Sequence, residues 1–253
     1  MLGVPEADRL WLRRSMDASL ERSRDTPVIP QHALEAMVAM QDYWDRLVAE
    51  LRRKPNDGLI SALLEAEIET DEGGRTRLTD GEVVGFCTLI GAAGNETVTK
   101  LLANAAVLFA RHPDEYVKIL DDPARIPNAV EEVLRYTSPS QYQGRTVTRD
   151  VCWYGTRVPA GARILLLTGS ANRDEREFPD ADRFDVERRI AIALGFGQGV
   201  HFCLGASLAR LESRVALEEF SRRFPRYTVD EPRCVRVHMS NVHGYESVPF
   251  EAA

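Results

Sequence analysis

One cysteine in this chain lies between closely spaced glycines and directly before a predicted helix. It is Cys203, in the run FGQGVHFCLG at residues 196–205, and an Ala/Leu-rich helical pattern follows over residues 206–220. N–H groups without partners and the positive end of the dipole at a helix start stabilise a thiolate. The glycines carry no Cβ, so the backbone can turn tightly and lie close against a flat partner. The run favours a site that presents one anionic sulfur to a metal from a single side; the alternative is a structural cysteine buried in a turn.

The same run resembles the haem-ligand loop of cytochrome P450, whose pattern F-x-x-G-x-H-x-C-x-G it matches at every fixed position. The resemblance implies that the Cys203 thiolate is the metal ligand of haem b, which is iron protoporphyrin IX. It also implies that Phe196, Gly197 and Gly205 help to bind this cofactor.

Two further side chains are expected at the haem propionates by the same resemblance. His201 lies two residues before the cysteine, and Arg145 follows the helix predicted at residues 126–136. The planar fork of an arginine suits a carboxylate. A structural histidine in a turn and a solvated arginine at a strand edge are the alternative interpretations.

A long helix is predicted from a capping box to about residue 110. Thr79 and Glu82 form the box, and Pro113 follows the predicted end. The first half of the helix, residues 83–93, is apolar all round, which predicts burial on every side.

Polar residues interrupt this helix at the sequence AGNET. Gly94 costs helix stability, and the Glu96 carboxyl and Thr97 hydroxyl follow it in an apolar setting. The run resembles the oxygen-binding motif A-G-x-[DE]-T of the cytochrome P450 I-helix, with Val98 in place of a second threonine. The resemblance implies that Glu96 and Thr97 are catalytic, in oxygen positioning and proton delivery, and that Ala93 lies at the haem. The alternative is a helix–helix contact through small residues, with Thr97 bonded to its own backbone.

Glu132 and Arg135 lie three residues apart, on one face of a predicted helix. A pair of this kind is often a solvated surface bridge. Here it resembles the K-helix E-x-x-R of the family, and the run FPDADRFD at residues 178–185 resembles the segment that supplies a third member. The resemblance implies that Glu132, Arg135 and Arg183 form a structural network that locks the cysteine loop against the helical core.

Hydrophobic spacing predicts the remaining elements. A further helix is expected at residues 34–51. The pattern then changes to a strand at 151–154, a turn at 158–161 and a strand at 164–167, and residues 227–250 are consistent with short strands.

The predicted fold is mainly α with a small β portion. The resemblance implies the C-terminal part of the cytochrome P450 fold, from about the F-helix onward, because residues 1–6 resemble the stretch that leads into that helix. Family members are considerably longer at the N-terminus. We therefore expect residues 1–253 to form a single domain, a haem-binding core that lacks the N-terminal region, from a gene fragment or a misplaced start.

Composition restricts the function classes. The formal net charge of −7 argues against non-specific binding to nucleic acid, which requires a basic surface. The four cysteines are scattered without a repeated spacing, so neither a disulfide framework nor a zinc site is indicated. The first residues turn acidic at once, and the longest uncharged stretch, residues 83–95, is too short to span a bilayer. We expect a cytoplasmic protein without membrane contact.

The resemblance implies a haem-thiolate monooxygenase that inserts one oxygen atom from O2 into a small organic substrate, with electrons from a ferredoxin-type donor. Residues expected to line the substrate space are Leu89, Ile90, Ala93, Ser140, Leu166 and Val242. Two alternatives stay open. One is a truncated haem-binding or haem-free remnant without turnover, and the other is an enzyme that uses Cys203 as a nucleophile with His201.

Overall fold

The computed structural model describes residues 2–23, 28–70, 73–239 and 241–252. These residues form two compact units. The first unit runs to Glu96 and includes His238 and Met239, and the second comprises residues 97–237 and 241–252. The single-domain organisation of residues 1–253 stays a prediction.

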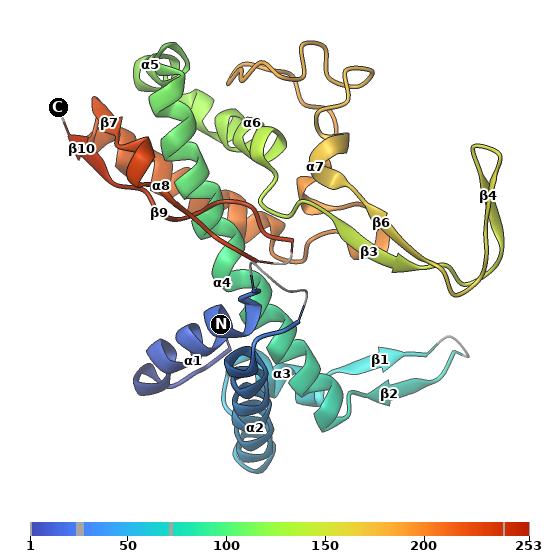
Figure 1. Ribbon diagram of the computed structural model, residues 1–253. Coiled ribbons are helices and arrows are strands. Elements are labelled where there is room, and N and C mark those ends of the chain that lie inside the picture. The colour runs from blue at the N-terminus through green and yellow to red at the C-terminus, as the bar shows by residue number, and fades with distance from the viewer. Residues whose placement is uncertain (1, 24–27, 71–72, 240, 253) are drawn as a thin grey trace. The chain divides into compact units, whose positions relative to one another are not determined.

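The first unit is mostly helical (Figure 1). Its elements are α1 (Glu6–Leu20), α2 (Gln31–Arg53), α3 (Leu59–Glu65), the strands β1 (Glu67–Glu69) and β2 (Arg75–Arg77), and the first part of α4 (Asp80–Arg111). Apolar residues at helical spacing on α1, α2 and α4 build one core, in which Trp44 and Val83 are completely buried. The helix predicted at residues 34–51 lies within α2, and the β1–β2 hairpin was not predicted.

The capping box at the start of α4 is confirmed. The Thr79 hydroxyl accepts a hydrogen bond from the Glu82 N–H at 3.3 Å, and a Glu82 carboxylate oxygen accepts one from the Thr79 N–H at 2.8 Å. The N–H and the hydroxyl of Thr79 together hold the pKa of Glu82 below its ordinary value. The ionised Glu82 carboxylate therefore adds to the free energy of unfolding at any pH above the ordinary pKa of a glutamate. This stabilisation is lost as the pH falls through the lowered pKa.

Thr79→Ala is expected to lower the free energy of unfolding at neutral pH by about 1 kcal/mol, because the Glu82 N–H loses its acceptor. Chemical denaturation followed by far-UV circular dichroism measures the loss. Thr76→Ala, in the exposed strand β2, is the control and should change little. Equal losses in the two variants would show that the cap contributes nothing specific.

The prediction that the first half of α4 is buried on every side is wrong. Val83, Val84 and Cys87 are buried, but Leu89 is 62% exposed and Ala93 is exposed. The reason is that the core of the first unit takes up only one face of the helix. An apolar face of α4 therefore remains open in this unit.

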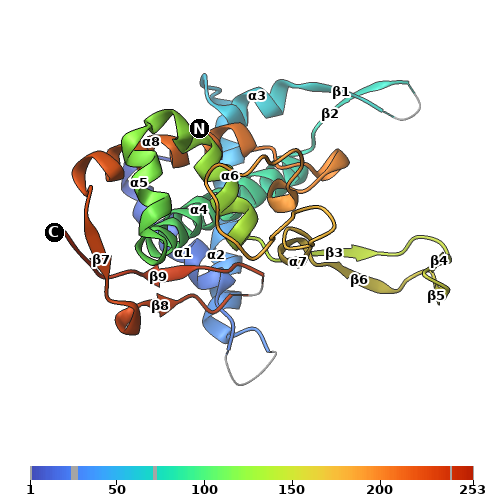
Figure 2. The same cartoon turned by 90° about the horizontal axis from the view of Figure 1, so that it is seen from above.

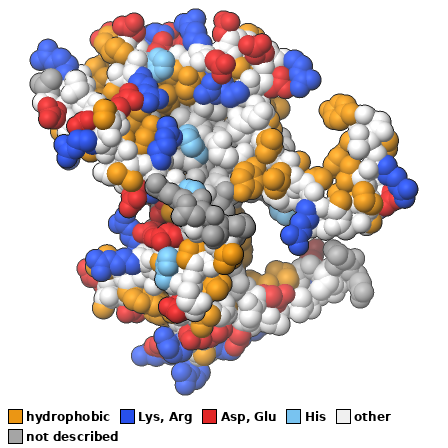
Figure 3. Space-filling model, in the orientation of Figure 1, with side chains coloured by type: hydrophobic (Ala, Val, Ile, Leu, Met, Phe, Trp, Pro, Cys, Tyr) orange, Lys and Arg blue, Asp and Glu red, His pale blue; other side chains and the backbone are white. Residues whose placement is uncertain are grey.

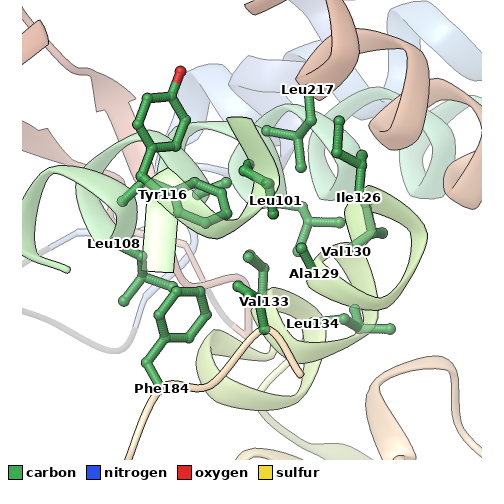
Figure 4. Close-up of a cluster of buried hydrophobic side chains, with 14 residues drawn as sticks. Leu101, Leu108, Tyr116, Ile126, Ala129, Val130, Val133, Leu134, Phe184 and Leu217 are labelled. Carbon is green, nitrogen blue, oxygen red and sulfur yellow. The ribbon is translucent and has the colours of Figure 1, made fainter. Parts of the chain in front are cut away.

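The second unit contains the other helices. They are the last part of α4, α5 (Pro113–Asp121), α6 (Ile126–Thr137), α7 (Thr168–Ala171) and α8 (Ala206–Arg223). The apolar faces of α4, α5, α6 and α8 meet in a cluster that includes Leu101, Ile126, Val133 and Leu217, together with Phe184 from the irregular segment after α7 (Figure 4). Complete burial of one such side chain stabilises the fold by about 1.5–3 kcal/mol. The cluster fixes α6, which carries the Glu132–Arg135 pair.

Every sheet among the described residues consists of two antiparallel strands. In the second unit β3 (Gln143–Thr146) pairs with β6 (Arg163–Leu166), β4 (Val151–Trp153) with β5 (Thr156–Val158), β7 (Tyr227–Val229) with β10 (Phe250–Ala252), and β8 (Val235–Arg236) with β9 (Tyr245–Ser247). The β4–β5 hairpin continues from the β3–β6 pair as one arm (Figure 2). Hydrophobic side chains gather along this arm (Figure 3), among them exposed Trp153 and Leu165.

The sequence predicted one turn at residues 158–161 between two strands, and this is wrong in part. Tyr154 and Gly155 both have positive φ, +48° and +78°, and they form a tight turn that pairs Trp153 with Thr156. This turn adds strand β5, which ends at Val158, inside the predicted connection. The mainly α fold with a small β portion is confirmed. Within the described residues, no helix has both the length and the apolar character of a membrane span.

Candidate functional site

Cys203 lies in a tightly turned loop directly before α8. Its N–H donates to the Phe196 carbonyl at 2.8 Å, and its own carbonyl accepts from the Ala206 N–H at 3.2 Å. Gly197 and Gly199 have φ of +72° and +68°, values that other L residues rarely adopt. These bonds close the loop on itself and leave the Cys203 side chain half-buried, so that a ligand can reach the thiol.

The start of α8 carries no side-chain cap at Gly205. The first of its N–H groups, at Ala206, donates to the Cys203 carbonyl, and the positive end of the helix dipole lies directly after Cys203, where the sequence predicted a helix start. A Cβ at Gly197 would lie 3.3 Å from the His201 carbonyl oxygen, and one at Gly205 would lie 4.0 Å from the Cys203 sulfur. Gly197 is required by its φ and by this close approach, whereas at Gly205 there is room for a methyl group.

A cation that the sequence did not single out lies beside this loop. The Arg210 guanidinium is 4.6 Å from the centre of the Phe196 ring, and its Nε donates to Glu131 Oε1 at 2.5 Å. The hydrogen bond to Glu131 raises the pKa of Arg210, and Cys203 also contributes to raising it. Arg210 thus holds a positive charge within electrostatic reach of the sulfur. Its place on α8, seven residues after Cys203, is the only signal in the sequence.

The Glu132–Arg135 pair is completely buried, so the interpretation as a solvated surface bridge is wrong. Arg135 Nε and Nη2 donate to the two Glu132 carboxylate oxygens at 2.7 and 2.9 Å. Arg135 Nη1 donates to the carbonyls of Asn172 and Ala181 at 2.8 and 2.9 Å. A bidentate pair whose remaining donors are also satisfied can be kept away from water. The pair therefore ties α6 to the segment after α7.

The third member of this network is Arg188, and the prediction of Arg183 is wrong. Arg188 Nε donates to Glu132 Oε1 at 3.3 Å, and its side chain is 10% exposed. The Arg183 side chain is 62% exposed and lies 3.7 Å from Asp185, and only its backbone carbonyl accepts from Arg135 and Arg188. The irregular backbone decides this choice, because Asp180 adopts a φ of +53° and the Asp180 carbonyl accepts from Arg188.

Arg188→Ala is expected to destabilise the second unit by about 3 kcal/mol, because it removes a nearly buried partner of Glu132 and the donor to the Pro179 carbonyl. Arg183→Ala is the matched change in the same segment and should cost under about 1 kcal/mol, since its side chain is exposed. Guanidinium denaturation measures both values. A larger loss for Arg183→Ala would restore the original assignment.

His201 and Arg145 lie in the second unit, as Cys203 does. His201 ends a short 3₁₀ turn, Gly199–His201, and its side chain is exposed. Arg145 lies on β3 opposite Ile164, is half-buried, and donates from Nη1 to the Gly144 carbonyl at 2.8 Å. Both positions leave a cationic or donor group at the surface, and their role at the propionates stays a prediction.

Ala93, Glu96 and Thr97 lie on consecutive turns of α4, at spacings that place them on one face. Ala93 is exposed, Glu96 is buried and Thr97 is half-buried. Ala93 and Glu96 belong to the first unit, and Thr97 begins the second. The catalytic role of Glu96 and Thr97 and the contact of Ala93 with the haem stay predictions.

The chemistry of the loop fits a haem. A half-buried cysteine offers a soft ligand, and the start of α8 places the positive end of a helix dipole directly after it. Val200, Phe202 and Leu204 in the same loop are exposed apolar side chains, which suit burial against a flat macrocycle. No cluster of three or more metal-ligating side chains is found in the part of the chain that the structure describes.

The family model named cytochrome P450 matches residues 125–234. The putative cytochrome P450 123 of Mycobacterium tuberculosis is 46% identical over 251 residues, which are 99% of this chain and 61% of that protein. The open cytochrome P450 Eryk from S. erythraea has a TM-score of 0.88 and 38% identity, and the match covers 100% of this chain and 64% of that one. CYP109E1 from Bacillus megaterium, solved with corticosterone, has a TM-score of 0.84 and 33% identity, covering 98% and 66%. This chain thus spans about 61% of the length of curated relatives such as the putative cytochrome P450 123.

Proposed function

The chain belongs to the cytochrome P450 family, and on that premise we propose that it binds haem b through Cys203 and acts as a haem-thiolate monooxygenase. The observation that carries the proposal is the loop around the half-buried Cys203, which is closed by its own backbone hydrogen bonds directly before α8. When bound, the haem supplies the activation of O2, and the thiolate ligand favours cleavage of the O–O bond.

The residues of this chain then have distinct tasks. The loop presents the Cys203 thiolate, while the start of α8 and Arg210 stabilise its negative charge. His201 and Arg145 bind the propionate carboxylates. The Thr97 hydroxyl and the Glu96 carboxyl would position oxygen and supply protons. Phe196, Gly197, Gly205 and Ala93 form contacts with the macrocycle.

The substrate is a small organic molecule, and the electrons come from a ferredoxin-type donor. Of the residues expected to line the substrate space, Leu89 on α4 and Leu166 on β6 are exposed apolar side chains. Ser140 and Val242 are joined by an isolated antiparallel bridge. The exposed apolar side chain of Leu166 and the bridge between Ser140 and Val242, all in the second unit, support the proposed lining within that unit. The solved relative that holds corticosterone supplies a suitable probe.

The alternative is a haem-binding or haem-free remnant without turnover. The observation that favours it is the apolar face of α8, where Leu208, Leu211 and Val215 are exposed at helical spacing. An exposed face of this kind is typical of a surface that another element covers.

The experiment reconstitutes the chain with haem, reduces it and adds carbon monoxide. A strongly red-shifted Soret band supports thiolate ligation, and an unshifted band or no haem uptake supports the remnant. Incorporation of isotopically labelled O2 into corticosterone, with electrons from a ferredoxin and its reductase, then separates a monooxygenase from a haem protein without turnover. Alkylation of Cys203 together with an absence of haem uptake would support the cysteine nucleophile.

A further inference from the structure

A single asparagine lies between the buried ion pair and the cysteine loop. Asn172 follows α7 directly and is completely buried. We propose that Asn172 is a positioning residue, which transmits the rigid geometry of the Glu132–Arg135 pair to the loop that carries Cys203. The spectroscopic part of this inference rests on the proposed function, whereas its structural part applies to the haem-free chain.

Each polar group of Asn172 has one partner. Its N–H donates to the Thr168 carbonyl at 3.0 Å, and its carbonyl accepts from Arg135 Nη1 at 2.8 Å. Its side-chain Nδ2 donates to Ser138 Oγ at 2.8 Å, and Oδ1 accepts from the Leu194 N–H at 2.7 Å. Burial of an amide is costly unless its groups are paired, so this set of bonds strongly restricts the position of Asn172.

On one side these bonds anchor Asn172 to the last turn of α6. Ser138 caps this helix with a φ of +40°, and its hydroxyl lies 3.2 Å from the Leu134 carbonyl to which it donates. The hydroxyl therefore donates to the helix and accepts from Asn172 at the same time. The Ser138 hydroxyl and Arg135 therefore hold Asn172 in a defined position at the end of α6.

On the other side Asn172 holds the start of the loop. Leu194 begins the 3₁₀ turn Leu194–Phe196, and the carbonyl of Phe196 accepts the hydrogen bond from the Cys203 N–H at 2.8 Å. The amide oxygen of Asn172 is thus separated from Cys203 by two hydrogen bonds and one short turn. A displacement of the Leu194 N–H reorients this turn and with it the Phe196 carbonyl.

The turn also packs so closely on α6 that it can shift only a little. A Cβ built on Gly195 would lie 2.6 Å from Leu134 Cγ, so Gly195 is needed for this approach. Close packing by itself does not set the register along the helix. The Asn172–Leu194 bond is directional, and it selects one position of the turn.

The first test measures hydrogen exchange in the haem-free chain. Asn172→Ala removes both side-chain bonds and should raise amide exchange over residues 194–203 by at least about tenfold, while the amides of Val130 and Val133 in α6 stay within about threefold. Asn172→Asp keeps an oxygen that accepts from the Leu194 N–H, and the Ser138 hydroxyl can turn to donate to it. Asn172→Asp should therefore restore most of the protection of residues 194–203 against amide exchange. Equal acceleration in α6 and in the loop, or none in the loop, would overturn the proposal.

A reciprocal variant tests the same bond from the loop. Leu194→Pro removes the N–H donor. Ala193, with φ −123° and ψ 144°, already has the extended backbone conformation that a residue before a proline prefers. Leu194→Ala is the control for loss of the side chain. If Asn172 acts through the Leu194 N–H, the double variant Asn172→Ala/Leu194→Pro accelerates exchange no more than the stronger single variant does. Additive effects would contradict the proposal.

The last measurement uses the haem-loaded chain. Asn172→Ala should move at least half of the reduced, CO-bound protein from the red-shifted to the unshifted Soret band, and Asn172→Asp should reverse most of this change. An unchanged spectrum in Asn172→Ala would refute the coupling to Cys203. If the unmodified chain itself shows no shifted band, the proposed function fails, and the exchange experiments still decide the role of Asn172.

Discussion

Cys203→Ser is expected to abolish the red-shifted Soret band of the reduced, CO-bound protein and to lower turnover by more than about a hundredfold. A serine hydroxyl is close to the cysteine thiol in size but stays protonated near neutral pH, so the anionic ligand is lost while the loop keeps its backbone bonds. The measurement is the CO-difference spectrum of the reconstituted variant, together with its haem content.

The other cysteines provide matched controls. Burial raises the pKa of Cys87 to about 11, so this thiol is protonated at neutral pH. Burial also raises the pKa of Cys234, and Cys152 lies exposed on β4. Cys152→Ser and Cys234→Ser should therefore leave the spectrum unchanged. If Cys203→Ser keeps the shifted band, or if a control variant loses it, Cys203 is not the ligand.

Glu132→Gln is expected to lower the free energy of unfolding of the second unit by about 3–5 kcal/mol. It leaves the completely buried Arg135 guanidinium without its charged partner, and it also weakens the bonds that Glu132 accepts from Arg188 and from the Asp185 N–H. Haem binding should fall with it, since the same network holds the segment that leads to the cysteine loop. Guanidinium denaturation and haem titration measure the two effects.

The preceding residue on the same helix is the control. Glu131 pairs with Arg210, but both side chains are partly exposed, so Glu131→Gln should cost less than about 1 kcal/mol. Its effect should appear in the spectrum instead, because Arg210 loses its anchor beside Phe196. Similar losses of stability in Glu131→Gln and Glu132→Gln would contradict the assignment of Glu132–Arg135 as the central pair.

The sequence predicted correctly those structural features that depend only on residues close together along the chain. The capping box at Thr79 predicted the start of α4, and the glycines of the cysteine loop predicted its tight turns. Each of these features depends on hydrogen bonds or backbone angles within a few residues. The spacing of Glu132 and Arg135 likewise places them on one helix face.

The predictions that were wrong concern features that depend on contacts between distant parts of the chain or on an unusual backbone conformation. Nothing in the sequence distinguishes Arg188 from Arg183, since both lie in an irregular segment whose path is set by contacts with α6. Leu89 is as apolar as its buried neighbours, and only the position of the other helices in its unit leaves it exposed. The turn of the β4–β5 hairpin places Tyr154 at positive φ, a conformation that is uncommon for a tyrosine, so the sequence did not indicate a turn there.

The family and the mainly α fold were determined by the sequence itself, because short motifs with strict local requirements and the hydrophobic spacing along the chain carry them, and the same motifs predict Cys203 as the metal ligand. Which arginine completes the buried network, and how Asn172 joins that network to the cysteine loop, were decided only by the tertiary structure. Bonds of this second kind join residues more than twenty positions apart, and their partners are selected by packing and burial.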